Sequence, residues 1–108
     1  MGGIKNNMDL SIINKLIKEK QIKWSQHILY RMQQRNIKIK DVLHSIKNGE
    51  IIETYEDDEP YPSCLIFGYT IDDKIIHTVC AIGENKLWMI TTYYPDPDEW
   101  DNNLKKRR

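Results

Sequence analysis

The chain has 108 residues, of which 40% are hydrophobic and 30% charged, and its formal net charge is zero. This length suits one domain, and the balance of residues excludes both a disordered chain and a membrane protein. The longest apolar runs are only a few residues, as in Leu65–Phe67, and the N-terminus lacks the apolar stretch of a secretory signal, so we expect a cytoplasmic protein without a membrane partner.

The zero net charge hides a separation of charge along the chain. Residues 1–49 carry ten Lys and Arg against three Asp and Glu, an excess of seven positive charges that the other residues balance. Acidic residues gather at 50–59 and 96–101, and the last four residues are basic: Lys105, Lys106, Arg107 and Arg108. A basic half and a basic terminus are typical of polyanion binding, although solvated faces of a Lys-rich protein would give the same pattern.

Hydrophobic spacing predicts helices first and strands afterwards. Apolar residues recur at intervals of three and four up to Gly49, and at every second residue from Glu50 onward. Asp9 and Ser25 are favourable N-caps, and Asn36 tolerates the left-handed conformation of a helix C-cap. The expected helices lie near residues 9–20, 26–35 and 38–48, and the expected strands near 51–55, 63–70, 75–82 and 86–94.

The last three predicted strands are joined by short polar turns, which favour an antiparallel meander. We expect an α+β fold, with N-terminal helices packed on an antiparallel sheet of about four strands. Residues 1–108 then form a single domain. Within it, residues 1–21 add an extra N-terminal helix, and residues 95–108 form a polar C-terminal tail with Trp100 as its only large apolar anchor.

Metal and thiol chemistry find little support in the sequence. Cys64 and Cys80 lie within predicted strands and are interpreted as reduced core residues, with a disulfide as the alternative. Neither they nor His27, His44 and His77 show the spacing of a zinc site. The clustered acidic residues lack the glycine spacing of a calcium loop. The sequence therefore predicts neither a metal nor another cofactor.

One edge of the second predicted helix is polar and carries side chains that suit a functional site. His27, Arg31 and Arg35 recur every four residues, so they line one side of the helix. Histidine moves protons near neutral pH, and arginine binds phosphate oxygens in a forked geometry, so this edge suits a phosphodiester site. A solvated polar face has the same spacing, and that alternative stays open.

Three residues of the predicted sheet are further candidates. His77 alternates with apolar residues, which indicates either a histidine on the floor of a groove or a hydrogen-bonded core residue. Thr91 and Tyr93, at the end of the last strand, supply hydroxyls that suit a phosphate or a stacked base, although both residue types are also ordinary strand formers. We predict that His27 and Arg31 face the same groove as His77 and Tyr93.

Several short motifs occur in a characteristic order. They are Ser25-x-His27, Arg31-Met32-x-x-Arg35, Asn48-Gly49-Glu50-Ile51-Ile52, Pro60-Tyr61-Pro62-Ser63, Gly68, Ile76-His77-x-Val79, Ile90-Thr91-x-Tyr93-x-Pro95-Asp96-Pro97, Trp100 and the terminal Lys/Arg cluster. In this order they resemble the bacterial domain-of-unknown-function family 4258 over roughly residues 22–108. The chain departs from that pattern at Lys38, where a Ser or Thr helix cap is usual.

The resemblance implies a fold similar to the RelE and BrnT toxins, which are metal-independent ribonucleases of toxin–antitoxin pairs. A small DNA-binding antitoxin neutralises those toxins, and members of the family that this chain resembles are often paired with a zinc-finger, helix-turn-helix protein. Carried over to this chain, the polar family positions are His27, Arg31, Arg35, His77, Thr91 and Tyr93.

The sequence thus predicts a toxin-type endoribonuclease that acts on single-stranded or ribosome-bound RNA through attack of the 2′-hydroxyl on the adjacent phosphate. The expected catalytic residues are His27 and His77 as base and acid, in either order, together with Arg31 and Tyr93. The expected RNA-binding residues are Arg35, Thr91, Lys105, Lys106, Arg107 and Arg108. The alternative is a non-catalytic module that binds a protein or a nucleic acid.

Overall fold

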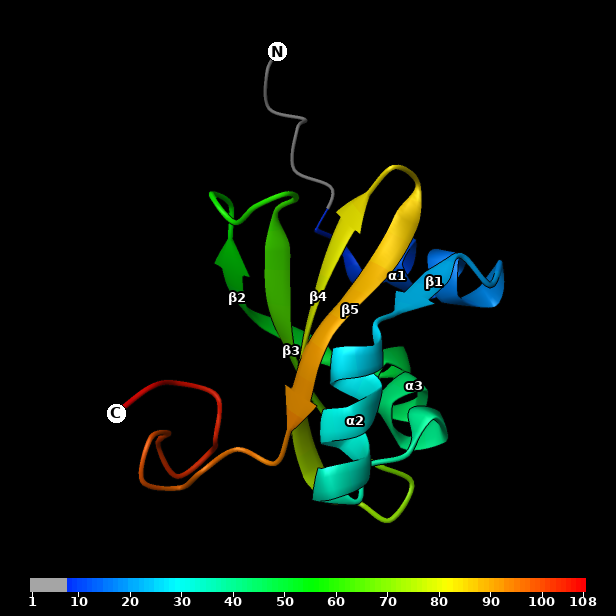
Figure 1. The fold of residues 1–108 in the computed structure, drawn as a ribbon. Coiled ribbons are helices and arrows are strands. Elements are labelled where there is room, and N and C mark those ends of the chain that lie inside the picture. The colour runs from blue at the N-terminus through cyan, green and yellow to red at the C-terminus, as the bar shows by residue number, and fades with distance from the viewer. Residues whose placement is uncertain (1–7) are drawn as a thin grey trace.

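The computed structural model describes residues 8–108, and its elements follow the predicted order except for one additional short strand after the first helix (Figure 1). The helices are α1 (Leu10–Lys18), α2 (Gln26–Arg35) and α3 (Ile39–Lys47). The strands are β1 (Ile22–Trp24), β2 (Glu50–Tyr55), β3 (Ser63–Tyr69), β4 (Ile75–Gly83) and β5 (Lys86–Tyr93). The predicted helix at the N-terminus is therefore confirmed over α1, and residues 1–7 of its expected segment lie outside the described residues.

Side-chain caps explain where two of the helices begin. The Asp9 carboxylate accepts a hydrogen bond of 2.7 Å from the Ser11 amide, and the Ser25 hydroxyl accepts one of 3.2 Å from the Ile28 amide. Helix α2 ends at Asn36, which has the predicted left-handed conformation with φ 57°. These local signals fix the boundaries of α1 and α2.

The sheet has five strands in the order β1-β5-β4-β3-β2. Strands β3 to β5 form the predicted antiparallel meander, and β2 extends it by pairing antiparallel with β3. Strand β1, however, pairs in parallel with β5, Ile22 lying opposite Leu87. The prediction of a wholly antiparallel sheet of about four strands is therefore wrong. A three-residue strand is too short to show a period of two, and its partner lies far along the chain.

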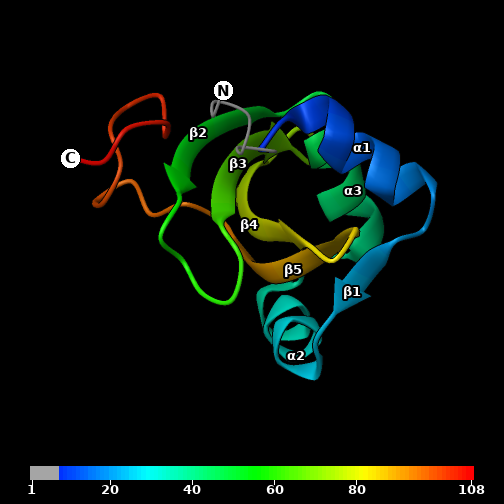
Figure 2. The ribbon, with the colours of Figure 1, turned by 90° about the horizontal axis from the view of Figure 1, so that it is seen from above.

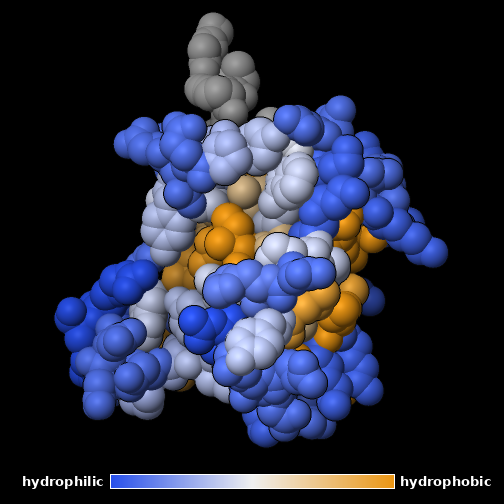
Figure 3. All heavy atoms as spheres, viewed as in Figure 1, coloured by the Kyte–Doolittle hydropathy of each residue, from blue (hydrophilic) through white to orange (hydrophobic). Residues whose placement is uncertain are grey.

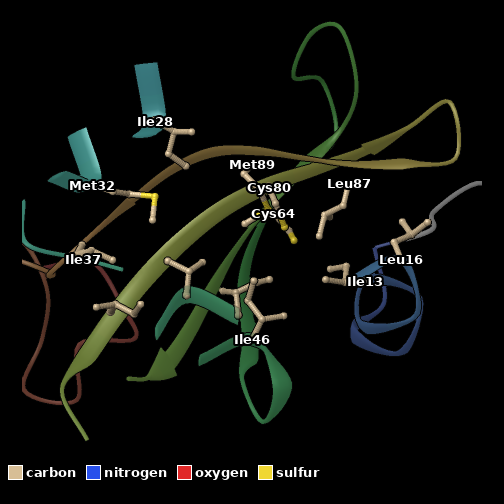
Figure 4. Packing of buried hydrophobic residues seen from close by; sticks show 13 residues of the cluster. Ile13, Leu16, Ile28, Met32, Ile37, Ile46, Cys64, Cys80, Leu87 and Met89 are labelled. Atoms are coloured by element: carbon tan, nitrogen blue, oxygen red, sulfur yellow. The ribbon is translucent and has the colours of Figure 1, made fainter. Parts of the chain in front are cut away.

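The core and helices α1 and α3 occupy one face of the sheet (Figure 2). Helices α1 and α3 lie in the hollow of the curved sheet, whereas α2 lies beside β5 (Figure 2). Figure 4 shows the side chains that fill the space between these layers. The core cluster consists of Ile13, Leu16, Ile28, Met32, Ile37, Val42, Ile46, Cys64, Ile66, Ile76, Cys80, Leu87 and Met89. Within residues 8–108, no helix is long and apolar enough to cross a membrane.

The opposite face of the sheet is covered by the C-terminal segment, which we define as residues 95–108. Its chain folds back on itself, since the Asp101 amide donates to the Lys106 carbonyl at 2.8 Å and Trp100 forms an antiparallel bridge with Arg107. The Trp100 side chain is 1% exposed although the segment around it is largely exposed. In Figure 1 the segment (orange to red) lies on the side of the sheet away from α1 and α3.

Candidate functional site

His77 stands at the centre of the sheet face that the C-terminal segment covers. It lies opposite Phe67 on β3 and Tyr93 on β5, so the three side chains share one face of the pleated sheet. The imidazole is fully buried, and its Nε2 lies 2.7 Å from the carbonyl oxygen of Leu104. A carbonyl only accepts hydrogen bonds, so Nε2 carries the proton and Nδ1 is left as a bare acceptor.

The second ring nitrogen of His77 has no partner. Its Nδ1 is buried and forms no hydrogen bond with any residue of the part of the chain that the structure describes. Buried polar atoms are nearly always satisfied, and each exception calls for an explanation. Burial is the main cause that lowers the pKa of His77, with a smaller opposing effect from the hydrogen bond to Leu104. The ring is therefore a neutral base with an unused lone pair.

Aromatic rings surround the imidazole. Trp100 contacts it edge-on, with ring centroids 4.5 Å apart and an interplanar angle of 87°. Tyr93 lies 5.4 Å away in a similar arrangement, and Phe67 lies 6.1 Å away. The floor of this site is thus an aromatic surface on the sheet, and Trp100 of the C-terminal segment lies on it.

A carboxylate on β2 completes the cluster. Glu53 lies opposite Leu65 on the same face, and the Arg107 guanidinium donates to it from Nε at 3.1 Å and from Nη2 at 3.2 Å. Tyr55 also donates its hydroxyl proton to Glu53, and burial together with this bond raises the pKa of Tyr55 to about 12. Charges on Glu53 and Arg107 influence the pKa of both His77 and Tyr93, so these groups share one electrostatic environment.

Exposed ion pairs hold the C-terminal segment on this face. Lys105 Nζ lies 2.9 Å from Glu50 and 4.8 Å from the centre of the Phe67 ring. Arg107 lies 4.5 Å from the centre of the Trp100 ring while it binds Glu53. Two of the predicted RNA-binding residues of the C-terminus are thus paired with carboxylates of β2 in this structure.

The other predicted RNA-binding residues have mixed environments. Arg108 donates from Nε to the Pro97 carbonyl at 2.8 Å, so it helps to close the segment. Lys106 is exposed, and its side chain forms no hydrogen bond or ion pair within residues 8–108. Thr91 is half-buried on β5, two residues before Tyr93 and on the same face of the sheet.

Helix α2 contributes one residue to the edge of the cluster. Arg35 donates from Nη1 to the Thr92 carbonyl at 2.9 Å, and its charge also influences the pKa of Tyr93. His27 and Arg31 are exposed on α2, and neither forms a hydrogen bond, ion pair or ring contact with His77 or Tyr93 among the described residues. The structure therefore groups His77, Tyr93 and Arg35, and it leaves His27 and Arg31 on the neighbouring helix surface.

Glu53 and Trp100 belong to the site but are absent from the predicted set. Glu53 is a carboxylate that directly follows two apolar residues in the middle of β2, and this is the sequence signal that could have pointed to it. A register shift between Ile51 and Glu53 sets its face, and no local pattern shows such a shift. Trp100 is noticeable in the sequence as an apolar anchor, but its contact with His77 depends on how the segment folds back.

The two cysteines lie on the other side of the sheet. Cys64 and Cys80 face each other across β3 and β4, and both are free and buried, as predicted (Figure 4). A hydrogen bond between the thiols lowers the pKa of Cys64 and raises that of Cys80. Three His, Cys, Asp or Glu side chains placed to hold a metal ion do not occur in the described part of the chain.

Comparison with known proteins gives one match. The model of a family described as "Domain of unknown function (DUF4258)" matches residues 24–94, which include α2, α3 and all strands from β2 to β5. This match confirms the resemblance found in the sequence. No curated protein and no solved structure matches the chain.

Proposed function

The chain belongs to the DUF4258 family, and we propose that it is a metal-independent endoribonuclease of the toxin type. The proposal includes a likeness of the fold to the RelE and BrnT toxins, with RNA as substrate and a small DNA-binding antitoxin as partner. The observation that carries it is the neutral, unpartnered Nδ1 of His77 beside Tyr93 and Glu53, with Arg35 at the edge.

Cleavage of RNA without a metal needs a base, a proton donor and a cation. The 2′-oxygen forms a bond to phosphorus and gives its proton to the base, while the bond from phosphorus to the 5′-oxygen breaks and the leaving 5′-oxygen takes a proton from the donor. A proton then passes from the base to the donor, directly or through water, and restores both groups. A neutral imidazole with a free lone pair suits the first proton transfer. A guanidinium suits the extra negative charge on the phosphate oxygens in the transition state.

The residues of the cluster match these roles. We assign His77 Nδ1 as the acceptor of the 2′-hydroxyl proton. Burial raises the pKa of Tyr93, so its hydroxyl keeps its proton and serves as a donor toward the leaving oxygen. Arg35 then contacts the phosphate, and His27 and Arg31 extend the contact surface along α2. In this proposal His27 binds RNA instead of sharing the acid–base role that the sequence suggested.

Cleavage assays test the assignment. Purified protein is incubated with a labelled single-stranded RNA, and products are examined for 2′,3′-cyclic phosphate ends. The variants His77→Asn, Tyr93→Phe and Arg35→Ala are compared with His44→Gln, which alters an exposed histidine on α3. We expect loss of His77 to slow cleavage by about 10²–10⁴. Equal cleavage by the folded His77→Asn protein, or no cleavage by any form, would overturn the assignment.

A second candidate function is a non-catalytic interaction module. One observation favours it: Leu29 and Ile39 are exposed where α2 meets α3, and they line a hollow of about 270 Å³. Exposed apolar surface of this kind is typical of contact with a protein partner. Induction of the chain in bacteria distinguishes the two candidates, since a ribonuclease stops growth and degrades RNA whereas an interaction module leaves RNA intact.

A further inference from the structure

We infer that the sheet face beneath the C-terminal segment is a subsite for an unpaired nucleobase, and that Trp100 occupies the place of that base in this structure. The inference rests on the proposed ribonuclease function and names the part of the RNA that binds next to His77. It also assigns residues 95–108 a role as a removable cover of the site.

The position of Trp100 is that of a ligand ring. Its indole meets the His77 ring edge-to-face, with ring centroids 4.5 Å apart, and it lies beneath the guanidinium of Arg107, which is 4.5 Å from the centre of the indole. Aromatic side chains and arginine guanidinium groups are the surfaces on which RNA-binding proteins hold unpaired bases. A base that replaced the indole would keep the aromatic floor covered, so opening of the C-terminal segment would not expose this floor to water.

The polar atoms of the floor are incompletely satisfied while the cover is closed. His77 donates from Nε2 to the backbone of the segment at Leu104, and its Nδ1 has no donor within the described residues. A nucleotide offers both kinds of partner, because its base edges and 2′-hydroxyl include donors as well as acceptors. Indole has a single N–H and no acceptor. Trp100 therefore fills the space of the site, but Nδ1 of His77 is left without a hydrogen-bond donor among the described residues.

The attachments of the segment suit reversible opening. It contains no helix and no strand beyond one isolated bridge. Its pair between Lys105 and Glu50 joins exposed side chains, and such a pair contributes little stability and is screened by salt. The pair between Arg107 and Glu53 is bidentate and Glu53 is only 23% exposed, so this pair is the stronger attachment of the segment. Figure 3 shows hydrophobic surface (orange) beside the hydrophilic segment at the lower left, so the segment does not cover the whole face.

Because Trp100 occupies the site, it lowers the apparent affinity of the site for RNA. If the site is open in only a fraction of molecules, the apparent dissociation constant rises by the inverse of that fraction. Weakening the cover should therefore strengthen RNA binding even when a positive charge is lost. Arg107→Ala provides this test, and Lys106→Ala is its matched control, because it removes the same charge from the same segment without breaking a side-chain contact.

The experiment follows Trp100 directly. In the variant Trp24→Phe/Trp88→Phe, Trp100 is the sole remaining tryptophan, and acrylamide quenching of its fluorescence reports its exposure. The probe is a single-stranded oligonucleotide of eight 2′-fluoro adenosines, which lacks the attacking hydroxyl and stays intact. We expect saturating oligonucleotide to raise the quenching constant of Trp100 several-fold. We also expect Arg107→Ala to bind it several-fold more tightly than the parent, and Lys106→Ala to bind it no more tightly.

The outcomes separate this inference from the proposed function. Binding with Trp100 still protected would overturn the inference and leave ribonuclease activity standing. Exposure of Trp100 on binding, without cleavage of the corresponding RNA, would support the subsite and overturn the catalytic assignment. Absence of binding at low salt would overturn both. Circular dichroism of each variant checks that the fold is intact.

Discussion

At the scale of single residues, Gly68 shows how closely the sheet approaches the helices. A Cβ atom on Gly68 would lie 2.1 Å from the carbonyl oxygen of Ser45 in α3, a backbone atom that cannot move away by itself. We expect Gly68→Ala to lower the free energy of unfolding by about 1–3 kcal/mol, the usual cost of overpacking. Gly83→Ala should cost less, because the three atoms nearest to its Cβ would belong to the Tyr61 side chain, which can move more easily than backbone. Urea denaturation measures both, and equal costs would contradict the expectation.

The burial of His77 leads to a prediction about pH. The folded protein disfavours the imidazolium, since burial lowers the pKa of His77, whereas an unfolded histidine titrates near its usual value of about 6.5. The unfolded chain therefore binds more protons below about pH 6.5, and the free energy of unfolding should fall as the pH drops from about 7.5 to 5. Glu53 opposes this effect and Arg107 adds to it, both more weakly than burial.

Two variants isolate that contribution. His77→Asn removes the titrating group, so its free energy of unfolding should depend less on pH over the same range than that of the parent. His44→Gln, which alters an exposed histidine, should keep the parent's dependence. Denaturant titrations at several pH values give the comparison. A His77→Asn profile parallel to that of the parent would mean that another group is responsible.

At the scale of residues, the sequence singled out His77 but left its role open. Alternation with apolar neighbours placed His77 on one face of its strand, and of the two alternatives raised there the structure shows the buried, hydrogen-bonded residue. The ring is bonded to backbone, as a core residue would be, and it also lies beside Tyr93. What covers that face depends on the path of residues 95–108, which have few apolar side chains and no periodicity to predict it.

At the scale of elements, α3 begins without a side-chain cap. Lys38 occupies the N-cap position and makes no capping hydrogen bond, whereas Asp9 and Ser25 cap the other two helices. Lys38→Ser should raise the free energy of unfolding by about 0.5–1 kcal/mol, because a hydroxyl there accepts a bond from a free helix amide. Lys38→Ala removes the same charge without supplying an acceptor and serves as control. Thermal unfolding of the two variants measures the difference, and equal midpoints would contradict the expectation.

Elements with strong local signals were predictable and β1 was not. The pattern Ile39, Val42, Leu43, Ile46 and the polar turns after Tyr69 and Gly83 gave α3 and the meander within a few residues. Strand β1 offers only three residues, and its parallel pairing joins Ile22–Trp24 to Leu87–Met89 across most of the chain. Such a pairing is decided by tertiary packing, which a local pattern does not contain.

At the scale of the whole molecule, the structure shows which of the charges separated along the sequence are paired and which are exposed. Lys105 and Arg107 of the last segment pair with carboxylates of β2, whereas Lys23 and Arg31 are exposed without an ion-pair partner among the residues that the structure describes. The cations of the N-terminal half are therefore available to a first encounter with RNA. Lys105 and Arg107 become available only when their pairs with Glu50 and Glu53 break.

This arrangement predicts how RNA affinity depends on salt. Each cation that neutralises a phosphate releases a counterion, so the logarithm of the association constant falls with the logarithm of salt concentration, by about 0.7 per contact for single strands. Lys23→Ala and Arg31→Ala should each weaken binding and make this slope shallower by about that amount. Asp57→Asn alters an exposed carboxylate of the acidic stretch at residues 50–59. This substitution should leave the slope unchanged, because the Asp57 side chain contacts no phosphate. Fluorescence anisotropy of a labelled single-stranded RNA between about 50 and 200 mM salt measures all three slopes. Affinity that does not vary with salt, or identical slopes for the parent and Arg31→Ala, would show that these cations do not hold RNA.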